Sequence, residues 1–256
     1  MANFECEFYS NVLDCRANFN VMLPEACTED VPVVFLLHGL SGNHNDWQRL
    51  TSVNRYAKER EIALVVPNGG KSFYCDMKHG DQYASYIGGE LLEYTRKVFP
   101  ISKKRETTFI AGMSMGGYGT MKLALSNPQN YAACAAFAGT MSIQENFQRP
   151  ERRKIGAAIW GEEGVDRLSG SDDDLYELVR RLEEAGNTDL RIYHGCGTED
   201  PLYPQNAQFR TFMEKSSFSY EYHERPGGHT WDVWDYFAEK SLDFFVRYMK
   251  ETGLRP

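Results

Sequence analysis

The chain has 256 residues and a formal net charge of −8, with 42% hydrophobic and 25% charged residues, which is the composition of an ordinary globular protein. Binding to a nucleic-acid backbone uses a surplus of Lys and Arg, which this acidic chain lacks, so we expect no nucleic-acid partner. No run of 18 uncharged apolar residues occurs, and the first residues include acids where a secretory signal is basic, so we expect no membrane attachment and a cytoplasmic location.

The length favours one domain spanning residues 1–256. The six cysteines include no CxxC pair, and a chain of this size does not need covalent cross-links for stability. We therefore expect reduced thiols, with no disulfide framework and no bound metal. The sequence leaves both a monomer and a homo-oligomer open.

The first part of the chain has two alternating segments, 5–9 and 17–23, on either side of a polar turn. This pattern predicts an antiparallel hairpin at the edge of a sheet. Further along, short apolar runs alternate with longer segments of helical character, which is typical of βαβ units. Buried parallel strands are predicted at 33–37, 63–66, 108–111, 133–138 and 190–193, with a weaker candidate at 220–223. The predicted fold class is α/β, with a mostly parallel central sheet and helices on both faces.

Residues 141–187 interrupt this alternation. They are rich in charge, and they contain the apolar segment IGAAIW at 155–160 and an amphipathic segment at 171–185 that predicts a helix. A long excursion between two strands of a compact domain is often a cover over a functional site. We therefore predict a small lid or cap insertion at 141–187 within the single domain.

A G-x-S-x-G pattern is centred on Ser114, where a predicted strand ends and helix-forming residues begin. In that context the serine occupies a sharp turn above the sheet, and glycine is needed at the flanking positions because side chains there would collide with neighbouring backbone. A phosphate-binding loop is not supported, because Tyr118 stands where a P-loop has lysine and Lys122 where G-x-G-x-x-G has its last glycine.

A serine nucleophile needs a histidine to accept its proton. Three histidines follow Ser114 in the sequence. His194 and His223 lie in or beside predicted strands, where they are more often packing residues, whereas His229 lies in the loop RPGGHTW after the last strand. Because a loop at a strand end can reach over the sheet, His229 is the predicted base.

The base needs an acid that orients it, and in an α/β-hydrolase the chain order is serine, acid, histidine. Asp200 lies in the turn GTEDP after a predicted strand and fits this order best, with Glu199 in reserve. Asp232 and Asp235 follow the histidine and break the order.

The developing oxyanion needs two N–H donors. The amide of Met115, after the nucleophile, and the amide of Leu40, in the loop after an early strand, are the candidates in this fold. A metal site is an alternative reading of this loop, with His38 and His44 as ligands together with Asp46 or His79. No HExxH or comparable spacing supports a metal there.

The segments HGLSGNHNDW, VVPNGGKSFYCD, FIAGMSMGGYG, GTEDPLY and GGHTWDVW resemble the esterase D-type α/β-hydrolases over almost the whole chain. The likeness is greatest to bacterial tributyrin esterases, and feruloyl or cinnamoyl esterases and S-formylglutathione hydrolases are related. The resemblance implies an α/β-hydrolase fold, a Ser114–His229–Asp200 triad, oxyanion donors at Leu40 and Met115, and no cofactor. S-formylglutathione hydrolases usually carry a cysteine shortly after the HG-Leu element, where this chain has Ser41-Gly42-Asn43.

The expected activity is hydrolysis of small-molecule esters with short acyl groups, such as tributyrin-like, acetyl or feruloyl esters. Trp47, Tyr74 and Trp160 are candidates for the pocket walls, because they lie in or near loops above the sheet. The alternatives are a thioesterase of the S-formylglutathione type, acyl transfer to another alcohol, and a binding module that keeps the fold without turnover.

Overall fold

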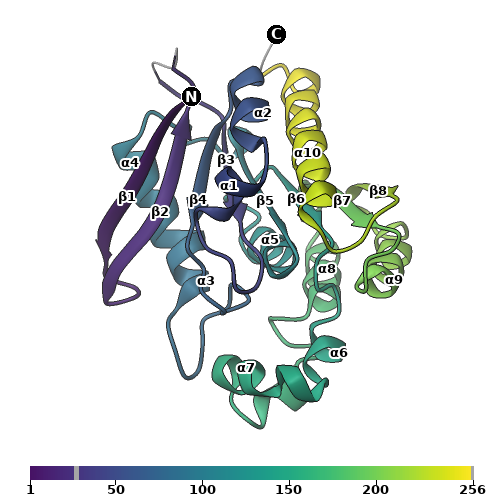
Figure 1. Ribbon diagram of the computed structural model, residues 1–256. Coiled ribbons are helices and arrows are strands. Elements are labelled where there is room, and N and C mark those ends of the chain that lie inside the picture. The colour runs from purple at the N-terminus through teal and green to yellow at the C-terminus, as the bar shows by residue number, and fades with distance from the viewer. Residues whose placement is uncertain (26–28, 255–256) are drawn as a thin grey trace.

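A computed structural model describes residues 1–25 and 29–254, and its centre is an eight-stranded sheet with the order β1-β2-β4-β3-β5-β6-β7-β8 (Figure 1). The strands are β1 (Ala2–Ser10), β2 (Cys15–Leu23), β3 (Val33–Leu37), β4 (Ala63–Pro67), β5 (Thr108–Met113), β6 (Ala133–Phe137), β7 (Arg191–Gly197) and β8 (Ser219–Arg225). β3 to β8 run parallel, while β1 and β2 form a hairpin that joins β4 in antiparallel register. The predicted α/β-hydrolase fold, with a mostly parallel sheet and an edge hairpin, is confirmed.

Some boundaries differ from the sequence-based ones. The strand predicted at 133–138 ends at Phe137, because Ala138 has a φ of 44°, which no β-strand accommodates. The weak candidate at 220–223 is a full strand, β8, that pairs with β7 along its length. The helix predicted at 171–185 begins only at Leu175, because the side chain of Asp174 accepts the N–H of Tyr176 and caps it there.

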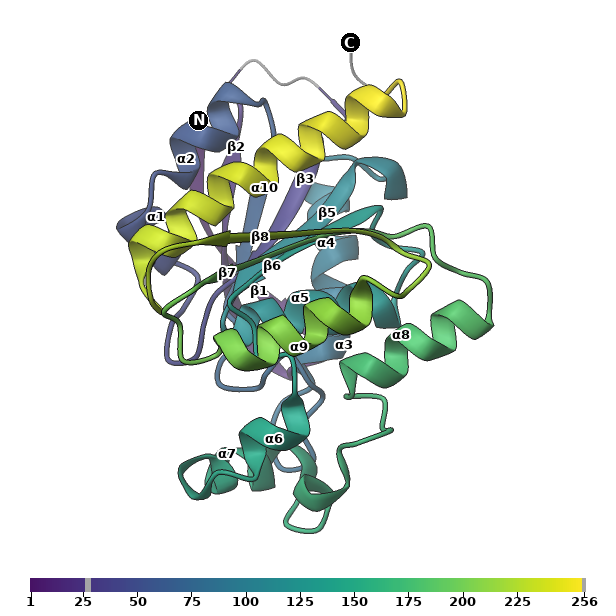
Figure 2. The ribbon, with the colours of Figure 1, turned by 90° about the vertical axis from the view of Figure 1, so that its right-hand side faces the viewer.

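Helices cover both faces of the sheet (Figure 2). They are α1 (Asp46–Leu50), α2 (Val53–Glu59), α3 (Tyr83–Ser85), α4 (Leu91–Val98), α5 (Met115–Ser126), α6 (Ile143–Phe147), α7 (Pro150–Trp160), α8 (Leu175–Glu184), α9 (Tyr203–Met213) and α10 (Trp231–Glu251). The two cores follow from strand alternation, because successive side chains point to opposite faces. In β3, Phe35 belongs to the core under α4, α5, α8 and α9, whereas Val34 and Leu36 belong to the core under α2 and α10.

The segment predicted as a lid, 141–187, divides into two parts. α8 packs beside α5 as a member of the helical layer, whereas α6 and α7 lie farther from the sheet (Figures 1 and 2). α7 begins at Pro150, whose ring suits the first turn of a helix, and ends before Gly161, whose φ is 79°. The assignment of this segment as a lid within one domain stays a prediction.

Within the described part of the chain, no helix is long and apolar enough to cross a lipid bilayer. Five cysteines are free thiols, and the sixth, Cys27, lies outside the described residues. Among the five, Cys75, Cys134 and Cys196 are buried, and their pKa values are raised by burial. These three side chains are therefore neutral thiols at pH 7.

Candidate active site

Ser114 lies between β5 and α5 in a strained turn, with φ 57° and ψ −118°, a region that residues other than glycine rarely occupy. A Cβ atom on Gly112 would lie 2.6 Å from the carbonyl oxygen of Gly116, and one on Gly116 would lie 2.5 Å from that of Leu37. Both distances are shorter than van der Waals contact allows. The glycines of the G-x-S-x-G pattern are therefore required because backbone from three segments converges at this turn.

The structure brings Ser114, His229 and Asp200 together. The Oγ of Ser114 lies 2.8 Å from Nε2 of His229, and Nδ1 of His229 lies 2.6 Å from Oδ2 of Asp200. The Asp200 side chain is fully buried and its Oδ1 accepts the N–H of Leu202 at 2.7 Å, whereas His229 is 27% exposed. This geometry is that of a nucleophile, a base and an orienting acid.

The loop after β3 lies directly against the serine turn, since a Cβ on Gly39 would be 2.6 Å from Sδ of Met113. His38 is fully buried, and its Nε2 accepts the N–H of Gly69 at 2.9 Å. Burial lowers the pKa of His38, so the ring is neutral and its proton is on Nδ1, 2.8 Å from the carbonyl oxygen of Gly39. This bond fixes the peptide plane that joins Gly39 to Leu40, and with it the direction of the Leu40 amide.

A cavity of 220 Å³ opens beside Ser114. It is lined by Gly39, Leu40, Ser41, Gly42, Asp46, Met113, Ser114, His229, Trp231 and Trp234. The two tryptophans come from the first turn of α10 and were missed from the sequence. Their spacing in the sequence could have indicated this. The two tryptophans follow His229 and are three residues apart, and residues i and i+3 share a helix face.

The three aromatic residues predicted to line the pocket do not line this cavity. Trp47 is fully buried and donates its Nε1–H to the carbonyl oxygen of Leu37 at 3.1 Å. Its ring packs edge-on against the ring of Trp231. Tyr74 is also fully buried, under the loop after β3. Trp160 is half-buried in the insertion and donates to Asp173. All three support neighbouring segments.

The other residues considered as base or acid have other contacts or are exposed. His194 is buried between Tyr220 and Asn206, and His223 stacks on Tyr193 at the sheet surface. Glu199 is exposed, beside the buried Asp200. The other two acids lie on α10, where Asp232 is exposed in the first turn and Asp235 accepts from Ser52 and Tyr56.

His194 makes the protein sensitive to acid. Burial lowers its pKa from 6.5 to about 4. Between these two pH values the His194 imidazole binds a proton in the unfolded chain but not in the folded one. The free energy of unfolding should therefore fall as the pH falls from 6.5 to 4, by up to about 1.4 kcal/mol per pH unit from this group. Urea denaturation of wild type and His194→Gln at pH 4.5, 5.5 and 7 measures this. We expect a smaller loss in the variant, and equal slopes would contradict the assignment.

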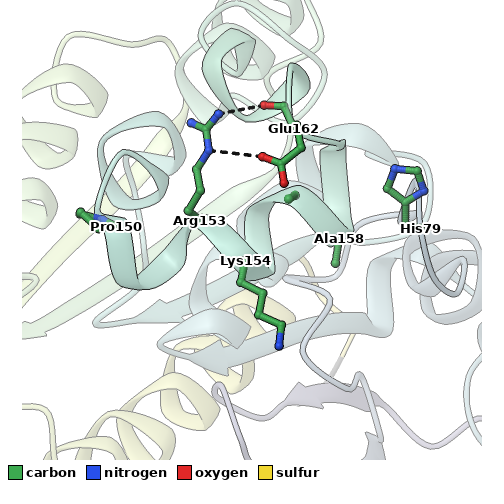
Figure 3. A pocket seen from close by; sticks show the side chains of 7 residues that line it. His79, Pro150, Arg153, Lys154, Ala158 and Glu162 are labelled. Carbon is green, nitrogen blue, oxygen red and sulfur yellow. Dashed lines mark hydrogen bonds and ion pairs between the residues drawn. The ribbon is translucent and has the colours of Figure 1, made fainter.

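A second pocket, of 680 Å³, lies beside α7 (Figure 3). His79, one of the residues weighed as a metal ligand, lines it and donates its backbone N–H to Ala158 at 3.0 Å. Arg153 and Glu162 are paired across it. In the part of the chain that the structure describes, no three His, Cys, Asp or Glu side chains are grouped as metal ligands.

The chain is similar to known proteins over nearly its whole length. A family model described as putative esterase matches residues 10–240. An acetyl esterase of Caldicellulosiruptor saccharolyticus is 30% identical over 265 residues, covering 96% of this chain and 99% of that protein. Two solved Staphylococcus aureus structures each align over 96% of this chain and 98% of theirs: the fluorophosphonate-binding serine hydrolase F, substrate bound (TM-score 0.89, 29% identity), and S-formylglutathione hydrolase (TM-score 0.87, 30% identity).

Proposed function

Because the chain belongs to the esterase family and is a serine hydrolase of carboxylic esters, we propose that it hydrolyses short-chain acyl esters through an acyl-enzyme on Ser114. One observation carries this proposal. The hydroxyl of Ser114 lies 2.8 Å from the imidazole of His229 and lines a cavity of 220 Å³.

In the first half of the reaction, Nε2 of His229 accepts the proton of Ser114 as Oγ attacks the ester carbonyl carbon. Asp200 accepts the Nδ1–H of His229, which keeps Nε2 free to act as base and stabilises the imidazolium that forms. The imidazolium then gives the proton to the departing alcohol oxygen. Water then attacks the acyl carbon while His229 accepts its proton. The bond from the acyl carbon to Oγ of Ser114 breaks, the imidazolium returns the proton to Oγ, and the acid product leaves.

In this mechanism the negatively charged carbonyl oxygen accepts hydrogen bonds from the amides of Leu40 and Met115. Met115 is the first residue of α5, so the helix N-terminus adds its positive dipole end at the same place. The Leu40 amide is held in place because two donors bind the carbonyl oxygen of the same peptide, namely Nδ1 of His38 at 2.8 Å and the N–H of Gly42 at 3.0 Å.

We infer short acyl groups from the size of the cavity, 220 Å³, which Trp231 and Trp234 line. Rigid aromatic rings beside Ser114 leave less room for a long acyl chain than for a short one. The 30% identity to an acetyl esterase supports the same range. The test is the kcat/KM of the wild type for p-nitrophenyl acetate, butyrate and octanoate and for methyl ferulate. We expect acetate or butyrate to be the best substrate, and a preference for octanoate or ferulate would overturn this specificity.

Trp231→Ala should widen the acyl preference. Removing this ring enlarges the cavity, so the ratio of kcat/KM for octanoate to that for butyrate should rise. We expect a rise of about 10-fold, which is the discrimination that one or two methylenes give in an apolar site. Tyr236→Ala, on an exposed position of the same helix, is the matched control and should leave the ratio unchanged. An unchanged ratio in Trp231→Ala would show that Trp231 does not limit chain length.

A second candidate is thioester hydrolysis, which is favoured by the 30% identity to S-formylglutathione hydrolase. The same triad and oxyanion donors would serve, because a thiolate is a better leaving group than an alkoxide. The sequence departs from that pattern at Ser41-Gly42-Asn43. Assaying S-formylglutathione beside the oxyesters separates the two, and a kcat/KM for the thioester well above that for every oxyester would favour the thioesterase.

We also propose that residues 1–256 act as one domain with 141–187 as its insertion.

A further inference from the structure

A buried ion pair behind the site has no part in the proposed chemistry. Lys122 of α5 lies with Nζ 2.7 Å from Oδ1 of Asp173, and the two side chains are 9% and 20% exposed. Burial acts to lower the pKa of Lys122, but beside the Asp173 carboxylate that pKa is raised overall, so the amine is charged. Burying two charges carries a desolvation penalty that can exceed their mutual attraction. The pair is therefore weak evidence of a stabilising role, and the segments that it joins indicate what else it does.

Asp173 attaches both arms of the insertion to the helix that begins at the nucleophile. Its Oδ2 accepts the indole N–H of Trp160, at the end of α7, at 2.6 Å. Its backbone carbonyl accepts the hydroxyl of Tyr118, one turn before Lys122 in α5, at 2.7 Å. The residue itself lies two positions before Leu175, where α8 begins. One carboxylate thus ties the end of α7, the start of α8 and the middle of α5 together.

Lys122 also contacts a strained turn. Its Nζ lies 3.4 Å from the carbonyl oxygen of Tyr74. Phe73 and Tyr74 have φ values of 52° and 55°, and a non-glycine residue keeps such a strained conformation only where its surroundings impose it. The surroundings include the insertion, because the ring of Phe73 packs edge-on against Phe147 of α6 at 4.8 Å. The turn is therefore held by the ion pair and by the insertion.

Tyr74 connects this turn to the loop that carries the Leu40 amide. Its hydroxyl donates to the carbonyl oxygen of His38 at 2.8 Å. Its ring lies against Gly119, where a Cβ would be 2.2 Å from Cδ2 of Tyr74. The ring therefore fills the space between α5 and the loop after β3, and a shift of the turn would remove the support under His38.

We propose that the Lys122–Asp173 ion pair is a positioning element for the esterase: it holds the strained Phe73–Tyr74 turn so that Tyr74 supports the oxyanion loop, and it makes this alignment depend on the docking of residues 141–187. The proposal rests on the proposed function, since it concerns the amide of Leu40. The insertion then contributes to the geometry of the transition state as well as to the surroundings of the substrate.

The test measures kcat and KM of Lys122→Met for p-nitrophenyl butyrate, with active sites counted by titration with a fluorophosphonate so that unfolded protein does not enter the rate. We expect kcat per site to fall about 10- to 100-fold, because a displaced oxyanion donor affects the transition state, while KM changes less than about twofold. Tyr74→Phe should lower kcat in the same way. The double variant should be no slower than the slower single variant, because both act on one path.

Arg153→Met is the matched control, because it breaks the exposed Arg153–Asp166 pair of the same insertion. Arg153 belongs to α7, which lies away from α5 (Figures 1 and 2), so this variant should leave kcat unchanged. If Lys122→Met does not fold, Lys122→Met/Asp173→Asn removes both charges and, with Tyr74→Phe, gives the same readout. Unchanged kcat per site, or effects that multiply in the Lys122→Met/Tyr74→Phe variant, would overturn the proposal. A wild type that the fluorophosphonate does not label would instead overturn the proposed function.

Discussion

Ser114→Ala should lower kcat/KM for p-nitrophenyl butyrate by at least about 10³-fold. The hydroxyl that would form the acyl-enzyme is absent in this variant, and only the oxyanion donors and the binding site remain to accelerate direct attack by water. The strained turn should survive, because alanine keeps the Cβ and the backbone bond from the Ser114 amide to the carbonyl of Phe137 at 2.9 Å. The measurement is steady-state hydrolysis beside thermal unfolding of both proteins.

The control for this loss is Ser126→Ala, which removes an exposed hydroxyl at the other end of α5. It should hydrolyse the ester at the wild-type rate. If Ser114→Ala is folded and retains full activity, Ser114 is not the nucleophile, and the whole proposed mechanism falls. If wild type and variant are both folded and inert towards every ester, the fold serves binding without turnover.

For Asp200→Asn, the expected loss in kcat is on the order of 10³- to 10⁴-fold, although the side chain changes little in size. A carboxylate accepts the Nδ1–H of His229 at 2.6 Å, whereas an amide can donate to Nδ1 and favour the tautomer with the proton on Nε2. In that tautomer Nε2 cannot accept the proton of Ser114. The Asn Oδ1 can still accept the N–H of Leu202, so the turn should keep its shape.

Glu199→Gln tests the neighbouring acid in the same assay. Its side chain is exposed while Asp200 is buried against the histidine, so we expect a change of less than about twofold in kcat. The reverse result, with Glu199→Gln inactive and Asp200→Asn active, would assign the orienting role to Glu199. Comparing kcat of the two variants at one pH is sufficient.

The strands and the serine turn could be predicted because their signals are local. β3 to β6 are buried on both faces, which gives continuous apolar runs, and the glycines around Ser114 stand within a few residues of it. The placement of His229 and Asp200 also followed from chain order and strand ends. Each of these inferences needs only neighbouring residues and a rule of topology.

The pocket walls could not be predicted in this way, because the direction of a loop side chain depends on what packs against it. Trp47 and Trp231 are both aromatic residues near the site. The contact between them is edge-on, at 5.5 Å, and only Trp231 lines the cavity while Trp47 is covered. The role of Lys122 was equally hidden, because a lysine in a helix is usually solvated, and its partner Asp173 lies in the insertion.

The serine turn also bears on how the protein folds. Ser114 takes its conformation from β6, through the bond to Phe137, and from β3, whose Leu37 carbonyl lies where a side chain on Gly116 would be. During synthesis, the turn therefore leaves the ribosome before β6, on which its geometry depends. Ser114 therefore takes its strained conformation only after β3, β5 and β6 have paired, and the pairing of β3 with β5 is non-local and forms slowly. Labelling of Ser114 by a fluorophosphonate during refolding would consequently report the pairing of β3, β5 and β6.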